Sequence, residues 1–116
     1  MNGEVLHLTE LAHEISRRFQ EEFPDEGERY GDAAYEWCVH DNRWLLGWAA
    51  EDLDVGRGHF LGNVRWLARV LGARGYPTDR LVRDLELAAE VVGEETATRR
   101  AVARTLQDGA AKLRRR

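Results

Sequence analysis

Apolar residues recur every three or four positions along most of this chain, which is the period of an amphipathic helix. Glycine and proline interrupt the pattern at intervals and so mark helix ends. No strand-like alternation of apolar and polar residues extends beyond four positions. The pattern predicts five helices, at about residues 9–22, 28–53, 59–71, 79–92 and 94–114.

Capping residues support several of these limits. Thr9 and Thr78 are predicted N-caps, because a hydroxyl oxygen can accept a hydrogen bond from an unpaired backbone N–H of the first turn. Residues 25–28 have the spacing of a reciprocal capping pair, and Gly93 is a natural C-cap. The last helix is the weakest prediction, since its apolar stripe is thin and Gly109 interrupts it.

Length and composition are those of a small globular protein. The chain has 116 residues, of which 43% are hydrophobic and 33% charged, and its two prolines leave room for long helices. A chain of this size commonly forms one domain with its own core. We therefore expect an all-α protein, an antiparallel helical bundle of four to five helices with short loops, folded as a single domain over residues 1–116.

The sequence also predicts a cellular setting. Cys38 is the only cysteine and cannot form an internal disulfide, which favours a reducing compartment. The longest apolar stretch, residues 44–50, has seven residues, whereas a membrane span needs about 20. Residues 1–8 lack the pattern of a signal peptide. Sixteen of the 17 basic residues are arginine, which is typical of a GC-rich bacterial genome. We expect a cytoplasmic bacterial protein.

Charge is distributed unevenly along the chain. Residues 1–56 hold 14 acidic and 4 basic residues, a net charge of −10, and residues 57–116 hold 7 and 13, a net charge of +6. The sum is the net charge of −4 of the whole chain. Such halves can pack against each other, or a second copy can pair with the first in antiparallel orientation.

Residues with catalytic or metal-binding chemistry occur without the partners they need. Glu10 and His13 have the spacing of two ligands in a di-iron bundle, but the motif occurs once instead of twice. Cys38 has no cationic neighbour in sequence, which predicts an inert buried thiol. Ser16 is the only serine, and residues 56–58 lack the third glycine of a phosphate-binding loop. We expect no enzymatic activity, no metal and no cofactor.

Two histidines are possible ligand contacts. His40 and His59 could serve as axial ligands to a haem or corrinoid, because neutral imidazole binds such metals. Neither lies in a recognisable cofactor motif. A position on the surface or at a helix end is the favoured interpretation for both.

Aromatic residues are the least ordinary feature of the chain. In the predicted helix 28–53, a spacing of three or four residues places on one stripe Tyr30, Ala34, Trp37, Asp41, Trp44 and Trp48. Together with Trp66 of the next helix, they could form a core, a protein interface or a pocket for a flat ligand, and core packing is favoured. Asp41 argues against a wholly dry core, because a buried unpaired carboxylate is costly; Arg43 or Arg65 could pair with it.

The C-terminal segment forms a basic tail that could contact phosphates of a nucleic acid. The whole chain is acidic, however, and cations near a helix C-terminus also stabilise the helix dipole. Nucleic-acid binding is therefore a minor alternative. The tail comprises Arg99, Arg100, Arg104, Lys112, Arg114, Arg115 and Arg116.

The middle of the chain resembles a helical module of bacterial cobalamin-binding sensory and regulatory proteins. The resemblance covers residues 37–92, and its most specific part is Arg74-Gly75-Tyr76-Pro77 after an apolar helix. The other matching positions are Cys38, Asp41, Arg43, Leu46, Ala50, Leu53, Phe60, Val64, Trp66, Leu71, Leu81, Leu85, Leu87, Glu90, Val91 and Val92. The corrinoid domain itself has no counterpart here, and Trp44 and Leu45 stand where a histidine is expected. The resemblance implies a sensory or regulatory helical domain.

The sequence thus favours a non-enzymatic regulatory or protein-interaction module that forms a homodimer without a membrane partner. In this hypothesis Trp37, Trp44 and Trp48 supply the core and the interface, and truncation of Trp44 to alanine costs about 3–5 kcal/mol. The first alternative is a ligand-sensing domain whose aromatic residues wall a pocket for a small planar cofactor of corrinoid or haem type. The second is a nucleic-acid-associated protein.

Overall fold

The computed structural model describes residues 6–55 and 59–114, and within them the chain is all-α, as predicted. Most of the helix limits lie within a few residues of those expected from the sequence. Six helices are present in these residues: α1 Leu8–Glu22, α2 Glu26–Tyr30, α3 Ala34–Val55, α4 His59–Ala73, α5 Thr78–Val92 and α6 Ala97–Arg114.

The single helix expected over residues 28–53 is wrong. A short helix, α2, ends at Gly31, where φ is 89°, a conformation that side chains with a Cβ rarely adopt. The chain then turns and starts α3 at Ala34. Tyr30 therefore belongs to a different helix from the tryptophans, and the expected four to five helices become six.

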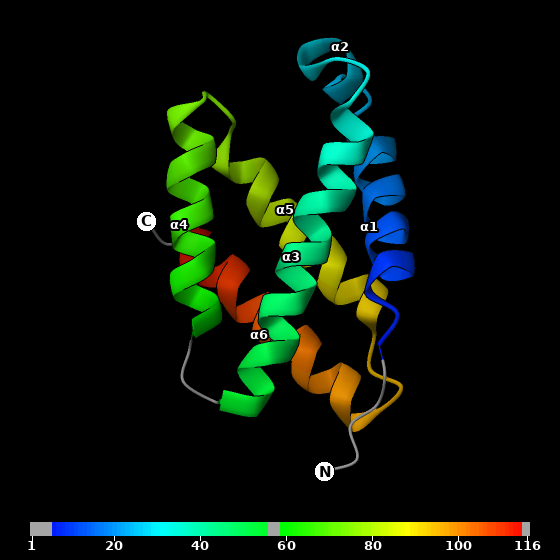
Figure 1. Cartoon of the computed structure of the whole chain (residues 1–116), viewed down its shortest axis with the longest axis vertical. Helices are drawn as coiled ribbons and strands as arrows, with labels where there is room; N and C mark the ends of the chain where they lie inside the picture. The colour runs from blue at the N-terminus through cyan, green and yellow to red at the C-terminus, as the bar shows by residue number, and fades with distance from the viewer. Residues whose placement is uncertain (1–5, 56–58, 115–116) are drawn as a thin grey trace.

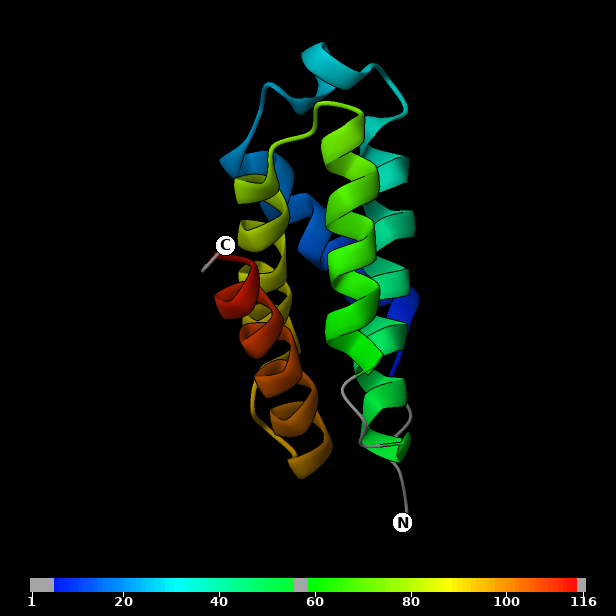
Figure 2. The same cartoon turned by 90° about the vertical axis from the view of Figure 1, so that its left-hand side faces the viewer.

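The helices pack as a bundle in which α1 and α3 lie side by side and α5 crosses behind them (Figure 1). The most extensive packing joins α5 to α6. Seen from the side, α3 and α4 run next to each other, with α5 and α6 on the other side of the molecule (Figure 2). One cluster of buried apolar side chains lies between these helices.

The last helix is continuous through Gly109, as predicted, and its apolar stripe is not interrupted there, because Gly109 lies on the buried face. Val102, Leu106 and Leu113 are buried along its inner face. Gly109 is itself buried, and the ring of Phe60 from α4 lies where a side chain at this position would project. Glycine thus permits a close approach of α4 to α6 at this point.

Only some of the predicted caps occur. Gly93 ends α5 with φ of 74°, and its N–H donates to the carbonyl of Ala89 at 3.0 Å, as predicted. Thr9 and Thr78 are not side-chain caps, because α1 starts at Leu8 and α5 starts at Thr78 itself. Asp25 precedes α2 without a capping hydrogen bond, and Arg80 engages its carboxylate instead.

The acidic and basic halves of the chain meet within one molecule. Arg80 pairs with Asp25 at 2.9 Å and with Glu26 at 2.5 Å, and Arg83 pairs with Glu22 at 2.7 Å. These contacts satisfy part of the charge polarity without a second copy. Among the helices described, none combines the length and apolar character needed to cross a membrane.

Candidate ligand pocket

A cavity of about 590 Å³ opens between α3 and α4. Residues of α2 and α5 complete its wall, and α1 contributes Phe19. Its polar lining is Glu26, His40, Asp41, Asn42, Arg74, Arg80 and Asp84. Its aromatic and apolar lining is Phe19, Tyr30, Ala34, Trp37, Cys38, Trp44, Trp48, Trp66, Leu67, Val70, Leu71, Tyr76 and Leu81. All five aromatic residues proposed from the sequence are therefore brought to this one site.

The favoured placement of the tryptophans in the core is wrong for Trp37 and Trp44, whereas Trp48 is half-buried and packs against the core. Trp37, Trp44 and Trp66 are 63%, 53% and 52% exposed, while Leu45 and Leu46 of α3 are fully buried. α3 carries apolar residues on two faces, so its periodicity alone does not identify the face that packs on the core. Packing against α1 selects the leucine face and leaves the tryptophans at the cavity.

The aromatic residues of α3 form a continuous row with His40 inside it. Trp44 Nε1 donates to His40 Nε2 at 3.2 Å, and ring centroids are 5.8 Å apart for Trp37 and His40. Trp44 and Trp48 follow with centroids 5.9 Å apart. Because Nε2 accepts from Trp44, the proton of a neutral His40 lies on Nδ1, which is 3.5 Å from Asp41 Oδ1. Both ring nitrogens are thus engaged.

Asp41 lines the cavity and is half-buried. Burial raises the pKa of its carboxyl, and the hydrogen bond from His40 and the charge of Arg74 oppose this shift. The structure therefore brings Arg74 into electrostatic range of Asp41, rather than the Arg43 or Arg65 expected from the sequence. Both of those arginines are exposed.

A buried polar centre joins three helices beside the cavity. Asn42 of α3 is 1% exposed, and its Nδ2 donates to Ser16 Oγ at 3.2 Å, to the Cys38 carbonyl at 3.1 Å and to Asp84 Oδ1 at 3.1 Å. These acceptors determine the orientation of the amide. Its Oδ1 is buried and has no hydrogen-bond partner in the part of the chain described.

Asp84 is the most perturbed carboxyl of this centre. Its pKa is raised to about 7, chiefly by burial and also by the charges of Asp41 and Glu26, while the hydrogen bond from Asn42 opposes the shift. Burial likewise raises the pKa of the Cys38 thiol well above its ordinary value, with the charge of Asp84 adding to the effect. The thiol is therefore protonated at neutral pH and unsuited to nucleophilic chemistry.

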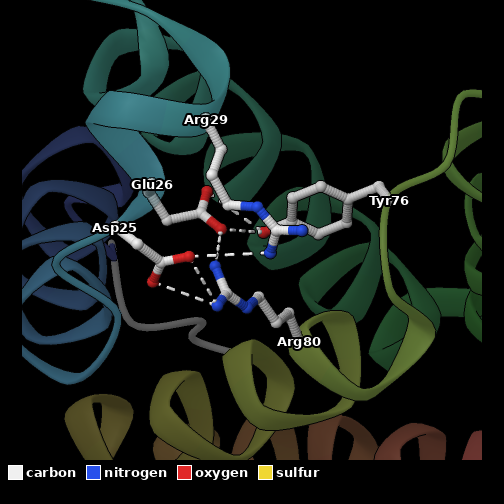
Figure 3. A network of polar contacts seen from close by, with 5 residues as sticks. All are labelled: Asp25, Glu26, Arg29, Tyr76 and Arg80. Atoms are coloured by element: carbon white, nitrogen blue, oxygen red, sulfur yellow. Dashed lines mark hydrogen bonds and ion pairs between the residues drawn. The ribbon is translucent and has the colours of Figure 1, made fainter.

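An ion-pair network fastens α2 across one end of the cavity (Figure 3). The buried Glu26 accepts from the Tyr76 hydroxyl at 3.2 Å and from Arg80 at 2.5 Å. Arg80 also donates to Asp25, whose other ion-pair partner is Arg29 at 3.6 Å. Burial and the charge of Glu26 raise the pKa of Tyr76. Sequence reasoning missed this network because its halves lie more than 45 residues apart.

Other residues singled out from the sequence lie elsewhere. His59 is exposed at the start of α4, in line with the favoured surface or helix-end position, and it does not line the cavity. His13 Nδ1 is 2.9 Å from the Tyr35 hydroxyl, away from His40. No group of three or more His, Cys, Asp or Glu side chains suited to a metal ion occurs in residues 6–55 and 59–114.

The basic tail makes contacts within the molecule. Arg99 donates to the Val92 carbonyl at 2.9 Å and Arg100 to the Glu94 carbonyl at 3.1 Å, at the C-terminal end of α5. A cation there stabilises the helix dipole. Arg114 pairs with Glu86. Arg104 and Lys112 are exposed, and Arg115 and Arg116 lie outside the described residues.

No protein-family model, curated protein or solved structure matches this chain. The resemblance of residues 37–92 to a cobalamin-associated helical module therefore stays a prediction.

Proposed function

We propose that this chain is a regulatory, ligand-sensing helical module whose cavity between α3 and α4 binds a flat, largely apolar small molecule. The observation that carries the proposal is the cavity itself, of about 590 Å³ with four tryptophans in its lining. Small-molecule sites typically have volumes of roughly 300–1,000 Å³ and mostly apolar walls with a few polar groups.

The exposure of the tryptophans supports ligand binding over core packing. Three of them leave about half or more of their surface open to solvent around the cavity. A flat ligand lying against these rings would remove that apolar surface from water, and burial of apolar surface is favourable by about 25 cal/mol per Å². Offset aromatic stacking adds to this gain.

The position of His40 bears on the kind of ligand. An axial bond to a haem or corrinoid metal would require His40 to lose its contact with Trp44 or with Asp41. A flat organic molecule makes no such demand, because it needs only the faces of the tryptophans. We therefore favour an organic ligand over a metal-centred cofactor, and binding without chemical conversion over catalysis.

Saturable binding of Nile red, an uncharged flat dye, tests the proposal by fluorescence titration. The parent should bind one dye per chain. The double variant Trp44→Ala/Trp66→Ala should weaken binding about tenfold or more, since a total loss of about 1.4 kcal/mol from the two ring contacts suffices. Leu53→Ala is the matched control, because Leu53 is an exposed α3 residue outside the cavity lining.

Native mass spectrometry of the parent and the double variant completes the test. Equal dye affinity of the two proteins would contradict the proposal. So would a parent that is dimeric, binds no dye and becomes monomeric in the double variant, because the tryptophans would then form an interface between two copies.

A further inference from the structure

We propose that the cavity selects a flat aromatic cation bearing N–H donors, and that Asp84 is the carboxylate that accepts from it. The proposal rests on the function proposed above and adds the chemical class of the ligand. Three independent features of the cavity support it: its walls, its charge balance and its unsatisfied acceptors.

The walls of the cavity suit a cation. Faces of tryptophan attract positive charge through the quadrupole of the ring, and tryptophan does so more strongly than phenylalanine or tyrosine. Four such residues line this site, from α3 on one side and α4 on the other. The protein already shows a contact of this type, since the Arg80 guanidinium lies 4.4 Å from the ring centroid of Phe23.

The charge balance at the cavity is negative. Of the two arginines in its lining, Arg80 is paired with both Asp25 and Glu26 and is therefore compensated. The remaining charged lining groups are Asp41, Asp84 and Arg74. With Asp84 ionised, these two carboxylates outnumber the one remaining cation, and the site is complementary to a positively charged ligand.

The acceptors beside the cavity have few donors. Asp84 is 6% exposed and receives one hydrogen bond, on Oδ1 from Asn42 Nδ2, in the described part of the chain. A buried carboxylate with so few donors is unfavourable. The neighbouring Asn42 Oδ1 has no partner. A ligand N–H reaching Asp84 would supply the missing donor and the missing positive charge together.

The protonation behaviour of Asp84 agrees with this arrangement and gives a second readout. Burial raises its pKa to about 7, so the free site is partly neutral near physiological pH. A bound cation would favour the ionised form, and affinity for the cation should therefore rise by about tenfold between pH 6 and pH 8. The titratable and charged groups that share the cavity with Asp84 are Glu26 of α2, Cys38, His40 and Asp41 of α3, Arg74 after α4, Tyr76 before α5 and Arg80 of α5 itself. From α1, the neutral Ser16 contacts Asn42.

Three probes that share one ring system test the proposal. 9-Aminoacridine is a cation with N–H donors, acridine is uncharged at pH 8, and acridine-9-carboxylate is an anion. Tryptophan fluorescence quenching at pH 8 should show the cation binding about tenfold tighter than acridine, with the anion weakest. Asp84→Asn should lower the affinity for the cation to that for acridine and remove the pH dependence.

Asp79→Asn is the matched control, because Asp79 is an exposed residue of the same helix outside the cavity. Circular dichroism checks that Asp84→Asn folds. If it does not fold, the test uses Asp41→Asn and the pH dependence of cation binding by the parent instead. Equal binding of cation and acridine would overturn the ligand class, and an unaltered preference in Asp84→Asn would overturn the role of Asp84. Both results leave the proposed function standing. Absence of binding by all three probes would overturn the ligand class, and Nile red then decides whether the proposed function falls with it.

Discussion

Substitution of Gly109 by alanine tests the close contact by which α6 supports α4, one wall of the cavity. A Cβ at Gly109 would lie 2.7 Å from Cε2 of Phe60, 3.5 Å from Cδ2 and 3.7 Å from Cζ. Contacts below 3.0 Å do not persist, so the ring or the helix must move. Phe60 is only 2% exposed, and its ring has little free space to enter.

Two opposing effects determine the sign of this change. Alanine in place of glycine inside a helix stabilises it by about 1 kcal/mol. Overpacking of a close-packed core costs about 1–3 kcal/mol. We expect a net loss of about 1 kcal/mol in the free energy of unfolding, which for a chain of this length lowers Tm by about 4 °C.

Gly62 provides the matched control on α4. It is exposed, and a Cβ built there meets no atom within 4 Å. Gly62→Ala should therefore stabilise the protein by about 0.5–1 kcal/mol, the opposite sign to Gly109→Ala. Urea denaturation followed by circular dichroism at 222 nm measures both.

A double-mutant cycle identifies the ring as the cause. Phe60→Leu should reduce the free energy of unfolding less in the Gly109→Ala background than in the parent, by about 0.5 kcal/mol or more. The reason is that leucine relieves the overlap between the side chain at position 60 and the new Cβ at position 109. If Gly109→Ala stabilises the protein as much as Gly62→Ala does, the close approach of α4 and α6 is refuted.

Three further predictions concern the site. Arg80→Met removes the cation that neutralises the buried Glu26, so urea denaturation should show a loss of about 1–3 kcal/mol, and an unchanged midpoint would contradict the ion-pair network. The pKa of Asp84 is raised to about 7 in the folded protein, so the folded state binds this proton more tightly than the unfolded state does. Proton binding by Asp84 therefore stabilises the fold fully below the unfolded pKa of about 3.9. This stabilisation is lost as pH rises through 7. Thermal melts from pH 5 to 8 should therefore show the parent losing stability relative to Asp84→Asn, and parallel curves would exclude this role. Leu46→Ala should lower the free energy of unfolding by about 2–5 kcal/mol, because the Leu46 side chain is fully buried. Trp37→Ala should lower it clearly less, because Trp37 is 63% exposed. Equal losses in urea denaturation would contradict the outward placement of Trp37.

Most of the helices could be predicted from sequence because their signals are local; the break between α2 and α3 at Gly31 was missed. Sequence patterns locate α4 and α5 within two residues of their observed limits. These patterns are the apolar spacing over residues 59–71 and 79–92 and the glycine at position 93. Helical periodicity depends on neighbours three or four positions away, so a single sequence contains it. The aromatic residues of the candidate site were also recognisable, since the three tryptophans at positions 37, 44 and 48 are unusual for twelve residues.

The direction in which those residues face required the tertiary structure. α3 is apolar on two faces, and only its packing on α1 decided that Leu45 and Leu46 enter the core while Trp37 and Trp44 line a cavity. A local pattern contains no information about which of two similar faces a distant helix covers.

The polar partners of the site were equally beyond a local pattern. Asn42 meets Asp84 across 42 residues and Glu26 meets Arg80 across 54. Each pairing depends on how the helices cross and on their register along one another. The sequence by itself therefore determined most of the helices, though not the break between α2 and α3, and the residue types available for a site. The tertiary structure decided which of them meet, because contacts between helices depend on packing geometry and not on spacing along the chain.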